Sequence, residues 1–207
     1  MSHRRQQGFT LVELLMALVL SSIFALALFA FFFSGVDSAR TTESQARAQS
    51  DGRTAIDRLA RDIRQAISPD KGLTAPVIAL TPTSVEVYVD PSRAVASTIP
   101  RPQRVRYSIV ANQLVREAVD PVGAVAPFTY GAYAQPEILI EALQNGATPA
   151  FVGVTRDGTT LPAAPTAVQI RTVAQVSITL IVSQRTGNKA TTLELSTDVA
   201  LRNAILP

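Results

Sequence analysis

The sequence contains no cysteine and no tryptophan, and its single histidine, His3, lies within the first eight residues. Without cysteine there is neither a disulfide framework nor a thiol nucleophile. Beyond residue 8 the chain also lacks the usual zinc ligands and the base of a Ser-His-Asp triad. No glycine-rich phosphate loop of either common spacing is present. We therefore expect neither an enzyme nor a protein with a cofactor or a metal.

Two carboxylate pairs remain as candidates for hydrolytic chemistry, Glu137 with Glu141 and Asp57 with Asp62. Two carboxylates can act together as acid and base when the fold holds them at a suitable separation. The alternative is that each pair lies on a solvated face of a strand or a helix. We expect the solvated faces.

The most informative segment is the N-terminus, where a short basic leader, residues 1–8, precedes Phe9-Thr10-Leu11-Val12-Glu13. An apolar run of 20 residues follows, from Leu14 to Phe33. At about 1.5 Å per residue, a helix of that length matches the roughly 30 Å hydrocarbon core of a bilayer. A secretory signal peptide is the alternative, but its apolar region is usually only about 7 to 15 residues long. The pattern favours a retained membrane anchor.

These residues resemble a known motif. Residues 8–14 (Gly-Phe-Thr-Leu-Val-Glu-Leu) are similar to the processing and methylation motif of type IV prepilins, which type II secretion pseudopilins share. The resemblance implies that a membrane-bound prepilin peptidase cleaves between Gly8 and Phe9 and methylates the new amine of Phe9. It also implies that Glu13 acts in filament assembly, and that other pilins or pseudopilins and an inner-membrane assembly platform are partners.

The chemistry of Glu13 agrees with that role. A carboxylate inside an apolar helix costs roughly 2 to 3 kcal/mol toward the bilayer centre, so it needs a partner. After cleavage the amine of Phe9 lies four residues before Glu13, and the carboxylate of one subunit can neutralise the amine of a neighbour. The alternative is an interfacial residue that reaches toward water. By the positive-inside rule, Arg4 and Arg5 place the N-terminus in the cytoplasm and everything after Phe33 outside it.

After the apolar run, Ile56, Leu59, Ile63 and Ile67 recur at helical spacing with charged residues between them. Breaker residues follow from Pro69. The pattern predicts one helix over about residues 9–67, with bending at Gly35 and Gly52. We thus divide the chain into a cleaved leader (1–8), a transmembrane and amphipathic helix (9–67) and a β-rich head (68–207).

The head is expected to be an antiparallel sheet. Alternation predicts strands at 84–89 and 104–109, with a turn at Ala111-Asn112 into residues 113–116. Weaker candidates are 137–143 and 150–154, and the first of these can equally be a helical turn. The clearest pair joins the apolar rows 176–182 and 193–201 across Thr186-Gly187-Asn188. Segments 90–103, 121–136 and 157–165 are expected to be surface loops. The fold class is α+β, a long helix packed on an antiparallel sheet, as the resemblance also implies.

A second, looser resemblance concerns the outer part of the helix and the head. Scattered residues at 58–66, in the 105–116 hairpin and at 201–203 are similar to PilW-like minor pilins, and the first two sets also to J-type pseudopilins. We therefore expect a minor pilin of a type IV pilus, which serves adhesion, twitching motility or DNA uptake. A J-type pseudopilin of type II secretion is the first alternative. The second is a membrane-anchored binding domain that never polymerises.

DNA contact is a further hypothesis. The chain has 19 basic and 16 acidic side chains, and Arg4 and Arg5 belong to the leader, so the mature chain is close to neutral. A basic strip on the predicted hairpin, with Arg104 and Arg106 on one strand face, can nevertheless touch phosphates. The alternative is a solvated face whose arginines protect an edge strand. The arginines considered are Arg93, Arg101, Arg104, Arg106 and Arg116.

Overall fold

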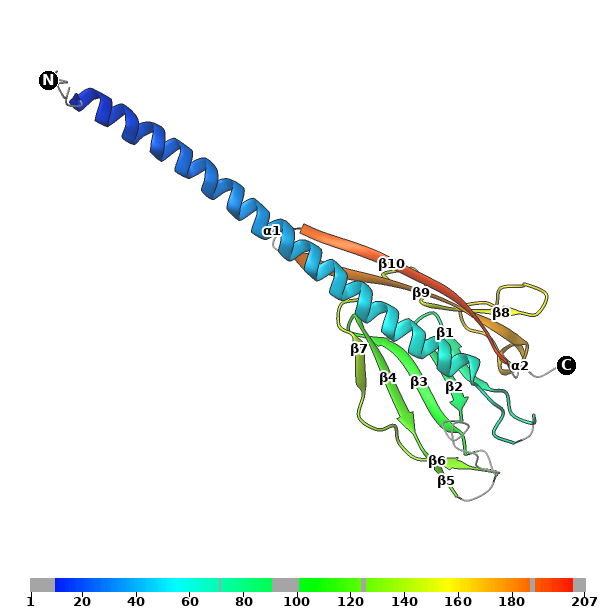
Figure 1. Cartoon of the computed structure of the whole chain (residues 1–207). Helices are drawn as coiled ribbons and strands as arrows, with labels where there is room; N and C mark the ends of the chain where they lie inside the picture. The colour runs from blue at the N-terminus through cyan, green and yellow to red at the C-terminus, as the bar shows by residue number, and fades with distance from the viewer. Residues whose placement is uncertain (1–9, 71, 91–100, 124–125, 187–188, 203–207) are drawn as a thin grey trace, which may run out of the picture. The chain divides into compact units, whose positions relative to one another are not determined.

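The computed structural model describes residues 10–70, 72–90, 101–123, 126–186 and 189–202. The chain forms two compact units, Met1–Gln45 and Ala46–Pro207. One helix, α1 (Leu11–Arg64), supplies the described part of the first unit and begins the second (Figure 1). The predicted long helix is thus present. Its hydrogen bonding is unbroken through Gly35 and Gly52, whereas Phe9 lies outside the described residues.

The second unit contains a five-stranded antiparallel sheet, which we call sheet A. Its strand order is β1-β2-β3-β4-β7. The strands are β1 (Val77–Thr81), β2 (Ser84–Val89), β3 (Gln103–Val110), β4 (Gln113–Val119) and β7 (Glu137–Ile140). The predicted hairpin is confirmed: Ala111 and Asn112 turn it with φ values of 49° and 62°, as a tight two-residue turn requires. Segment 137–143 is a strand rather than a helical turn over its first four residues.

A three-stranded sheet, sheet C, has the order β10-β9-β8. Its strands are β8 (Phe151–Thr155), β9 (Val173–Thr186) and β10 (Lys189–Ala200). The predicted pairing of the last two strands is confirmed, with Leu195 opposite Leu180 and Val199 opposite Val176. The two apolar rows therefore lie side by side on one face of the sheet, and their side chains contribute to the hydrophobic core.

Three smaller elements complete the second unit. The strands β5 (Pro121–Val122) and β6 (Thr129–Tyr130) form a two-stranded ribbon. The prediction of an unstructured loop over 121–136 was therefore wrong for these four residues, whose pairing is too short to leave a periodic pattern. The helix α2 (Ala167–Arg171) begins at a capping box between Thr166 and Gln169.

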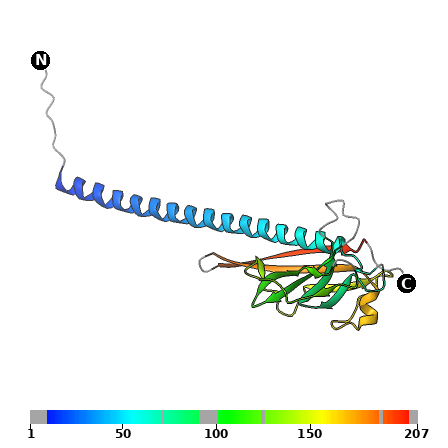
Figure 2. The same ribbon diagram turned by 90° about the horizontal axis from the view of Figure 1, so that it is seen from below.

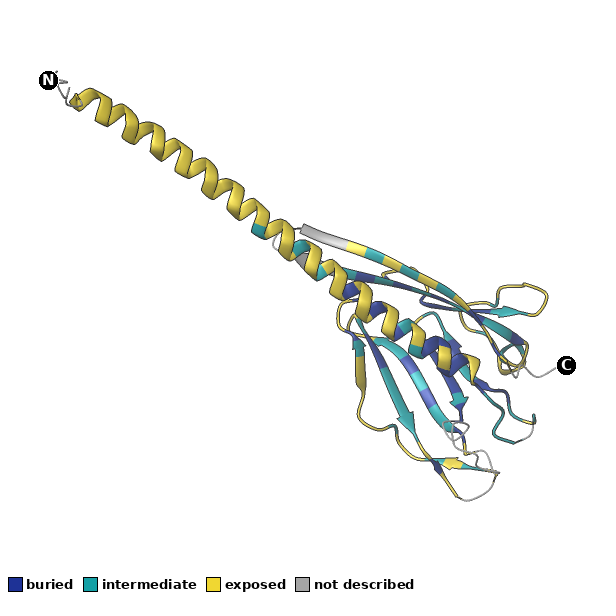
Figure 3. Cartoon of the chain, viewed as in Figure 1, coloured by how far each residue is buried: buried dark blue, intermediate teal, exposed yellow. Residues whose placement is uncertain are grey.

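The second half of α1 lies across the inner faces of both sheets, which are on one side of it in Figure 2, while Figure 1 shows β9 and β10 to one side of the helix and β3, β4 and β7 to the other. Its buried face is made of small or aliphatic residues together with one carboxylate, as the dark residues in Figure 3 indicate. These residues are Ala48, Gly52, Ala55, Leu59, Ala60, Asp62 and Ile63. Opposite them lie the core residues of the strands, including Val85, Tyr107, Leu114, Ile178 and Leu180. The fold is α+β, as predicted.

Gly52 is part of this contact. A Cβ atom at Gly52 would lie 2.4 Å from Leu195 Cδ1 and 3.7 Å from Val182 Cγ2. The glycine therefore lets the helix approach the β9–β10 pair closely. The sequence predicts only bending at Gly52, because it does not show which residue faces the glycine.

Gly153 in β8 offers a stability test, since a Cβ there would lie 2.6 Å from Leu80 Cδ2 and 3.2 Å from Leu161 Cδ1. We expect Gly153→Ala to lower the free energy of unfolding by about 1–3 kcal/mol through overpacking. The matched control is Gly131→Ala, which meets nothing within 4 Å and should change stability by less than about 0.5 kcal/mol. Urea unfolding followed by tyrosine signals measures both, because all four tyrosines, residues 88, 107, 130 and 133, lie in the head. Equal midpoints for the two variants would contradict the packing argument.

Candidate functional site

The helix α1 begins with a reciprocal cap between Thr10 and Glu13. The amide N–H and the hydroxyl of Thr10 donate to Glu13 Oε2 at 3.2 and 3.3 Å, and the Glu13 N–H donates to Thr10 Oγ1 at 3.3 Å. This is the capping-box geometry, which satisfies donors that a helix start leaves without partners. This role of Glu13 was not predicted, although the Thr-x-x-Glu spacing is its usual signature. Gly8 and Phe9, the predicted processing and methylation residues, lie outside the described residues.

Beyond this cap, α1 presents apolar side chains to all sides. Every described residue from Thr10 to Ser34 is exposed, and the most apolar 18-residue window has a mean hydropathy of 2.6 and no buried share. By length and composition the helix is able to cross a membrane. An open apolar groove follows one face of this segment, lined by Ala25, Leu28, Phe29, Phe31, Phe32, Gly35, Val36 and Ala39. So much exposed apolar surface requires lipid or other helices around it.

Arg104 and Arg106, the two arginines predicted to share a strand face, are engaged with other groups. Arg104 forms an ion pair with Glu86, and Arg106 donates to Glu117 Oε2 at 2.9 Å through Nε and 2.7 Å through a terminal nitrogen. Both guanidinium groups also lie over the ring of Tyr133, at 5.4 and 4.3 Å from its centroid. Burial raises the pKa of Tyr133, and the nearby Glu86 adds to this shift. This cluster is close to electrically neutral.

The other arginines considered for DNA contact lie elsewhere. Arg101 donates to the carbonyl oxygens of Pro121 and Gly123, Arg116 lies on the opposite face of sheet A, and Arg93 is outside the described residues. The alternative of edge protection is wrong, because β3 is the central strand of sheet A. Among the described residues, moreover, no group of three or more His, Cys, Asp or Glu side chains is placed to hold a metal ion.

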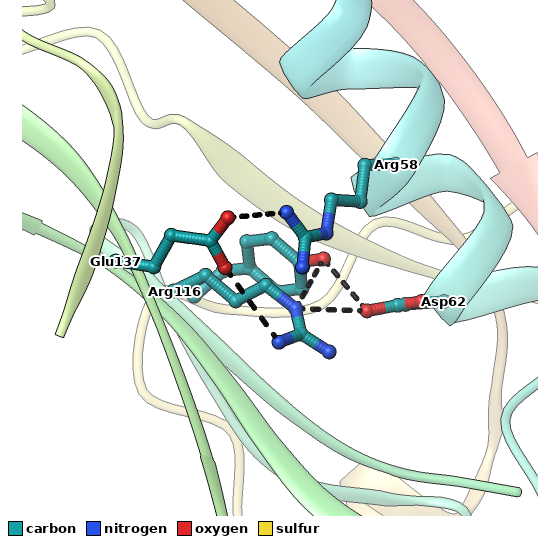
Figure 4. Close-up of polar contacts among 5 residues, drawn as sticks. Arg58, Asp62, Arg116 and Glu137 are labelled. Carbon is teal, nitrogen blue, oxygen red and sulfur yellow. Dashed lines mark hydrogen bonds and ion pairs between the residues drawn. The ribbon is translucent and has the colours of Figure 1, made fainter. Parts of the chain in front are cut away.

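A polar network joins α1 to sheet A (Figure 4). The Tyr107 hydroxyl donates to Asp62 Oδ2 at 2.7 Å, and Arg116 Nε lies 3.2 Å from both of these oxygens. Glu137 extends the network by accepting from Arg58 and by facing Arg116 at 4.0 Å. The expectation that Asp62 lies on a solvated face was wrong: it is only 9% exposed, because the helix turns it toward β3 and β4.

Electrostatics keep Tyr107 and Arg116 in their protonated forms. Burial, followed by the Asp62 carboxylate, raises the pKa of Tyr107, so its hydroxyl remains a donor. Burial acts against the charge on Arg116, but Tyr107 and Asp62 outweigh it and raise the pKa of Arg116. A buried carboxylate that is paired in this way fixes how the helix rests on the sheet. We interpret the network as a brace that fixes the position of the helix, and assign it no catalytic role.

Comparison with known families gives one match. The family described as the prokaryotic N-terminal methylation motif matches residues 3–29. No curated protein matches the chain. The matched residues include the predicted cleavage site, the capped helix start and most of the exposed apolar segment. The motif is the type IV prepilin-like signal, and it supports a pilin or pseudopilin, a structural subunit rather than an enzyme, that is anchored in a membrane.

The two ends of the brace differ in burial, which provides a test. The side chains of Arg116 and Asp62 are 15% and 12% exposed, whereas those of Arg58 and Glu137 are 39% and 47% exposed. Arg116→Met leaves a buried carboxylate without its cation, so we expect a loss of about 2–4 kcal/mol in unfolding free energy. Arg58→Met should cost less than about 1 kcal/mol. Urea unfolding followed by tyrosine signals compares the two variants, and equal losses would show that the buried pair is not the brace.

Proposed function

We propose that the protein is a minor pilin of a type IV pilus, anchored in the bacterial inner membrane before assembly and then incorporated into, or priming, the filament. The observation that supports this proposal most is that the methylation motif at residues 3–29 runs into α1, whose apolar segment is exposed throughout. A helix with this surface is stable in lipid, or in a bundle of similar helices once it leaves the lipid. In this proposal the filament replaces the membrane as its environment.

Phe9 and Glu13 carry the docking step. Cleavage after Gly8 by the prepilin peptidase leaves a cationic, N-methylated amine on Phe9, and the Glu13 carboxylate of a neighbouring subunit pairs with it. In the isolated chain Glu13 accepts from the Thr10 N–H at 3.2 Å, the long end of the normal range, and from the Thr10 hydroxyl at 3.3 Å, beyond it. A carboxylate has about four acceptor sites, so Glu13 can accept from a neighbouring amine without first losing its own cap.

The topology follows from the leader. Arg4 and Arg5 hold the N-terminus in the cytoplasm, and the head folds outside the inner membrane. Residues 1–8 are removed, residues 9–67 contain the anchor and the amphipathic helix, and residues 68–207 form the head. The assembly platform and the other pilins meet the apolar segment of α1. The neutral cluster around Arg104 and Arg106 lends no support to DNA contact.

A type II secretion pseudopilin of the J kind is the alternative within the same class, because the methylation motif is common to both systems. The assignment as a minor subunit rests on the scattered similarities of the head. The genes beside this one discriminate between the systems: a retraction ATPase favours a pilus, and a secretin with a pseudopilin set and no retraction motor favours secretion. A non-polymerising anchored domain would not be cleaved at Gly8.

Processing is tested by the mass of the N-terminal peptide from protein purified from its native membrane, with and without the host prepilin peptidase. We expect a terminus at N-methylated Phe9 that is lost when the peptidase is deleted. Residues 1–8 then remain on the chain, since no other cut is proposed. An intact leader in wild-type cells would overturn the proposal and leave an ordinary signal anchor.

Assembly is tested by Glu13→Gln, which keeps hydrogen-bonding capacity but removes the charge. We expect normal cleavage after Gly8 and at least roughly a tenfold fall in the share of the protein found in sheared filaments, because an amine in an apolar bundle then lacks its counter-charge. Thr10→Ala is the matched control, since it removes the hydroxyl of the cap and leaves the carboxylate. Quantitative blotting of the filament and membrane fractions measures both variants. Unchanged incorporation of Glu13→Gln would remove the role given to Glu13.

A further inference from the structure

Among the described residues of the head, the outer edge of β10 is a long edge without a neighbouring strand. β10 spans 12 residues and pairs with β9 without a bulge. The other outer strands are different: β7 has four residues, and β1 and β8 each carry an irregularity. The edge of β8 is also occupied, since the Gly153 carbonyl accepts from Leu161 and the Ala150 N–H donates to Pro82.

The hydrogen bonds show which backbone groups of β10 face outward. The Leu201 N–H donates to the Ala174 carbonyl at 2.8 Å, so in this register the odd-numbered residues of β10 bond to β9. The other side of β9 agrees, because the Thr179 N–H donates away from β10 to Ala150. The amides and carbonyls that point outward belong to Thr192, Glu194, Ser196, Asp198 and Ala200. In the described part of the chain, none of these groups has a backbone partner.

Between residues 192 and 200 the edge has no lysine, no proline and no bulge, and its charged residues there are both acidic. A basic residue, Lys189, stands at the start of the strand. The side chains of Leu193 and Leu195 are half-buried on the inner face, where an added strand can extend the apolar row. Glu194 and Asp198 are exposed on the outer face. A strand added here therefore meets an alternation of apolar and anionic positions.

This charge pattern selects the occupant. A second copy of β10 paired antiparallel about Ser196 would place Glu194 of each chain directly opposite Asp198 of the other, and pairing about Glu194 would place the two Glu194 carboxylates opposite each other. Like charges directly opposite in a sheet are destabilising. Lysine or arginine at the outer-face positions of an incoming strand would be opposite these carboxylates instead. The edge thus fits an extended cationic segment, and it disfavours those registers of a second copy that place carboxylates opposite each other.

We propose that the β10 edge of sheet C binds an extended segment of another protein by strand addition, and that this segment alternates lysine or arginine with valine, isoleucine or leucine. Main-chain hydrogen bonds from Thr192 to Ala200 supply the affinity, and Glu194 and Asp198 supply the charge selectivity. The proposal does not depend on the pilin assignment, because an anchored domain that never polymerised would present the same edge.

The probe is a capped nine-residue peptide that alternates lysine with valine, added to the full chain in detergent micelles. We expect it to slow hydrogen exchange at the outward amides of Thr192, Glu194, Ser196 and Asp198, and to leave the inward amides of the strand unchanged. A peptide with glutamate in place of lysine should not bind. Binding that leaves exchange at the four amides unchanged, or that does not distinguish the two peptides, would overturn the proposal, as would a β10-paired dimer without peptide.

Three variants separate edge pairing from general charge attraction. Glu194→Gln combined with Asp198→Asn should weaken peptide binding by roughly three- to tenfold, the value of two cross-strand charge pairs. Glu141→Gln is the matched control, an exposed carboxylate outside β10, and should leave affinity unchanged. Ser196→Pro removes one outward N–H without removing a bond to β9 and should abolish binding while the exchange of β9 amides stays as in the wild type. An equal effect of Glu141→Gln, or wild-type affinity of Ser196→Pro, would contradict strand addition.

Discussion

The close approach of α1 to two sheets is the constraint on which the head depends. Sheets A and C share no strand, so the helix that crosses both of them unites their inner faces in one core. Small residues make this possible, and at Gly52 even a methyl group would require Leu195 to move. Larger residues lower on the same helix, Leu59 and Ile63, then become fully buried. Apolar contact alone does not fix how a helix is rotated about its own axis on a sheet. The pairing of Asp62 with Tyr107 and Arg116 fixes that rotation for α1.

Much of this fold was predictable because its signals are local. The helix came from continuous hydrophobicity followed by helical spacing, and the strands β2, β3, β4, β9 and β10 from alternation with turn residues between them. The division into two sheets was not predictable, since it depends on which strands pair across long stretches of chain. The small ribbon of β5 and β6 was not predicted either, because strands of two residues are too short to show an alternating pattern. Helix propensity alone predicts bending at Gly52. The structure shows instead that Leu195 packs against this position and leaves no room for a side chain.

In the candidate site, too, local features were predictable from the sequence and long-range contacts were not. The motif around Glu13 is contiguous, so its resemblance could be read directly, and the match to residues 3–29 supports it. The environment of Asp62 was misjudged because the residue lies between charged neighbours in sequence, while its partners are 45 and 54 residues away. The arginines on β3 were misjudged for the converse reason. Their alternation was correct, but the carboxylates that neutralise them come from β2 and β4, which only the register of the sheet reveals.

The pairing of charges bears on how the head meets other molecules. Arg104, Arg106 and Arg116 are each opposed by a carboxylate, so these cations add little to a long-range field around the head. The described surface also offers two short-range features for contact. The apolar segment of α1 offers shape and hydrophobicity in a membrane or a bundle, and the β10 edge offers regularly spaced main-chain groups. Because the first acts without water and the second acts in water, one chain can be held by its helix while its head remains available to a different partner.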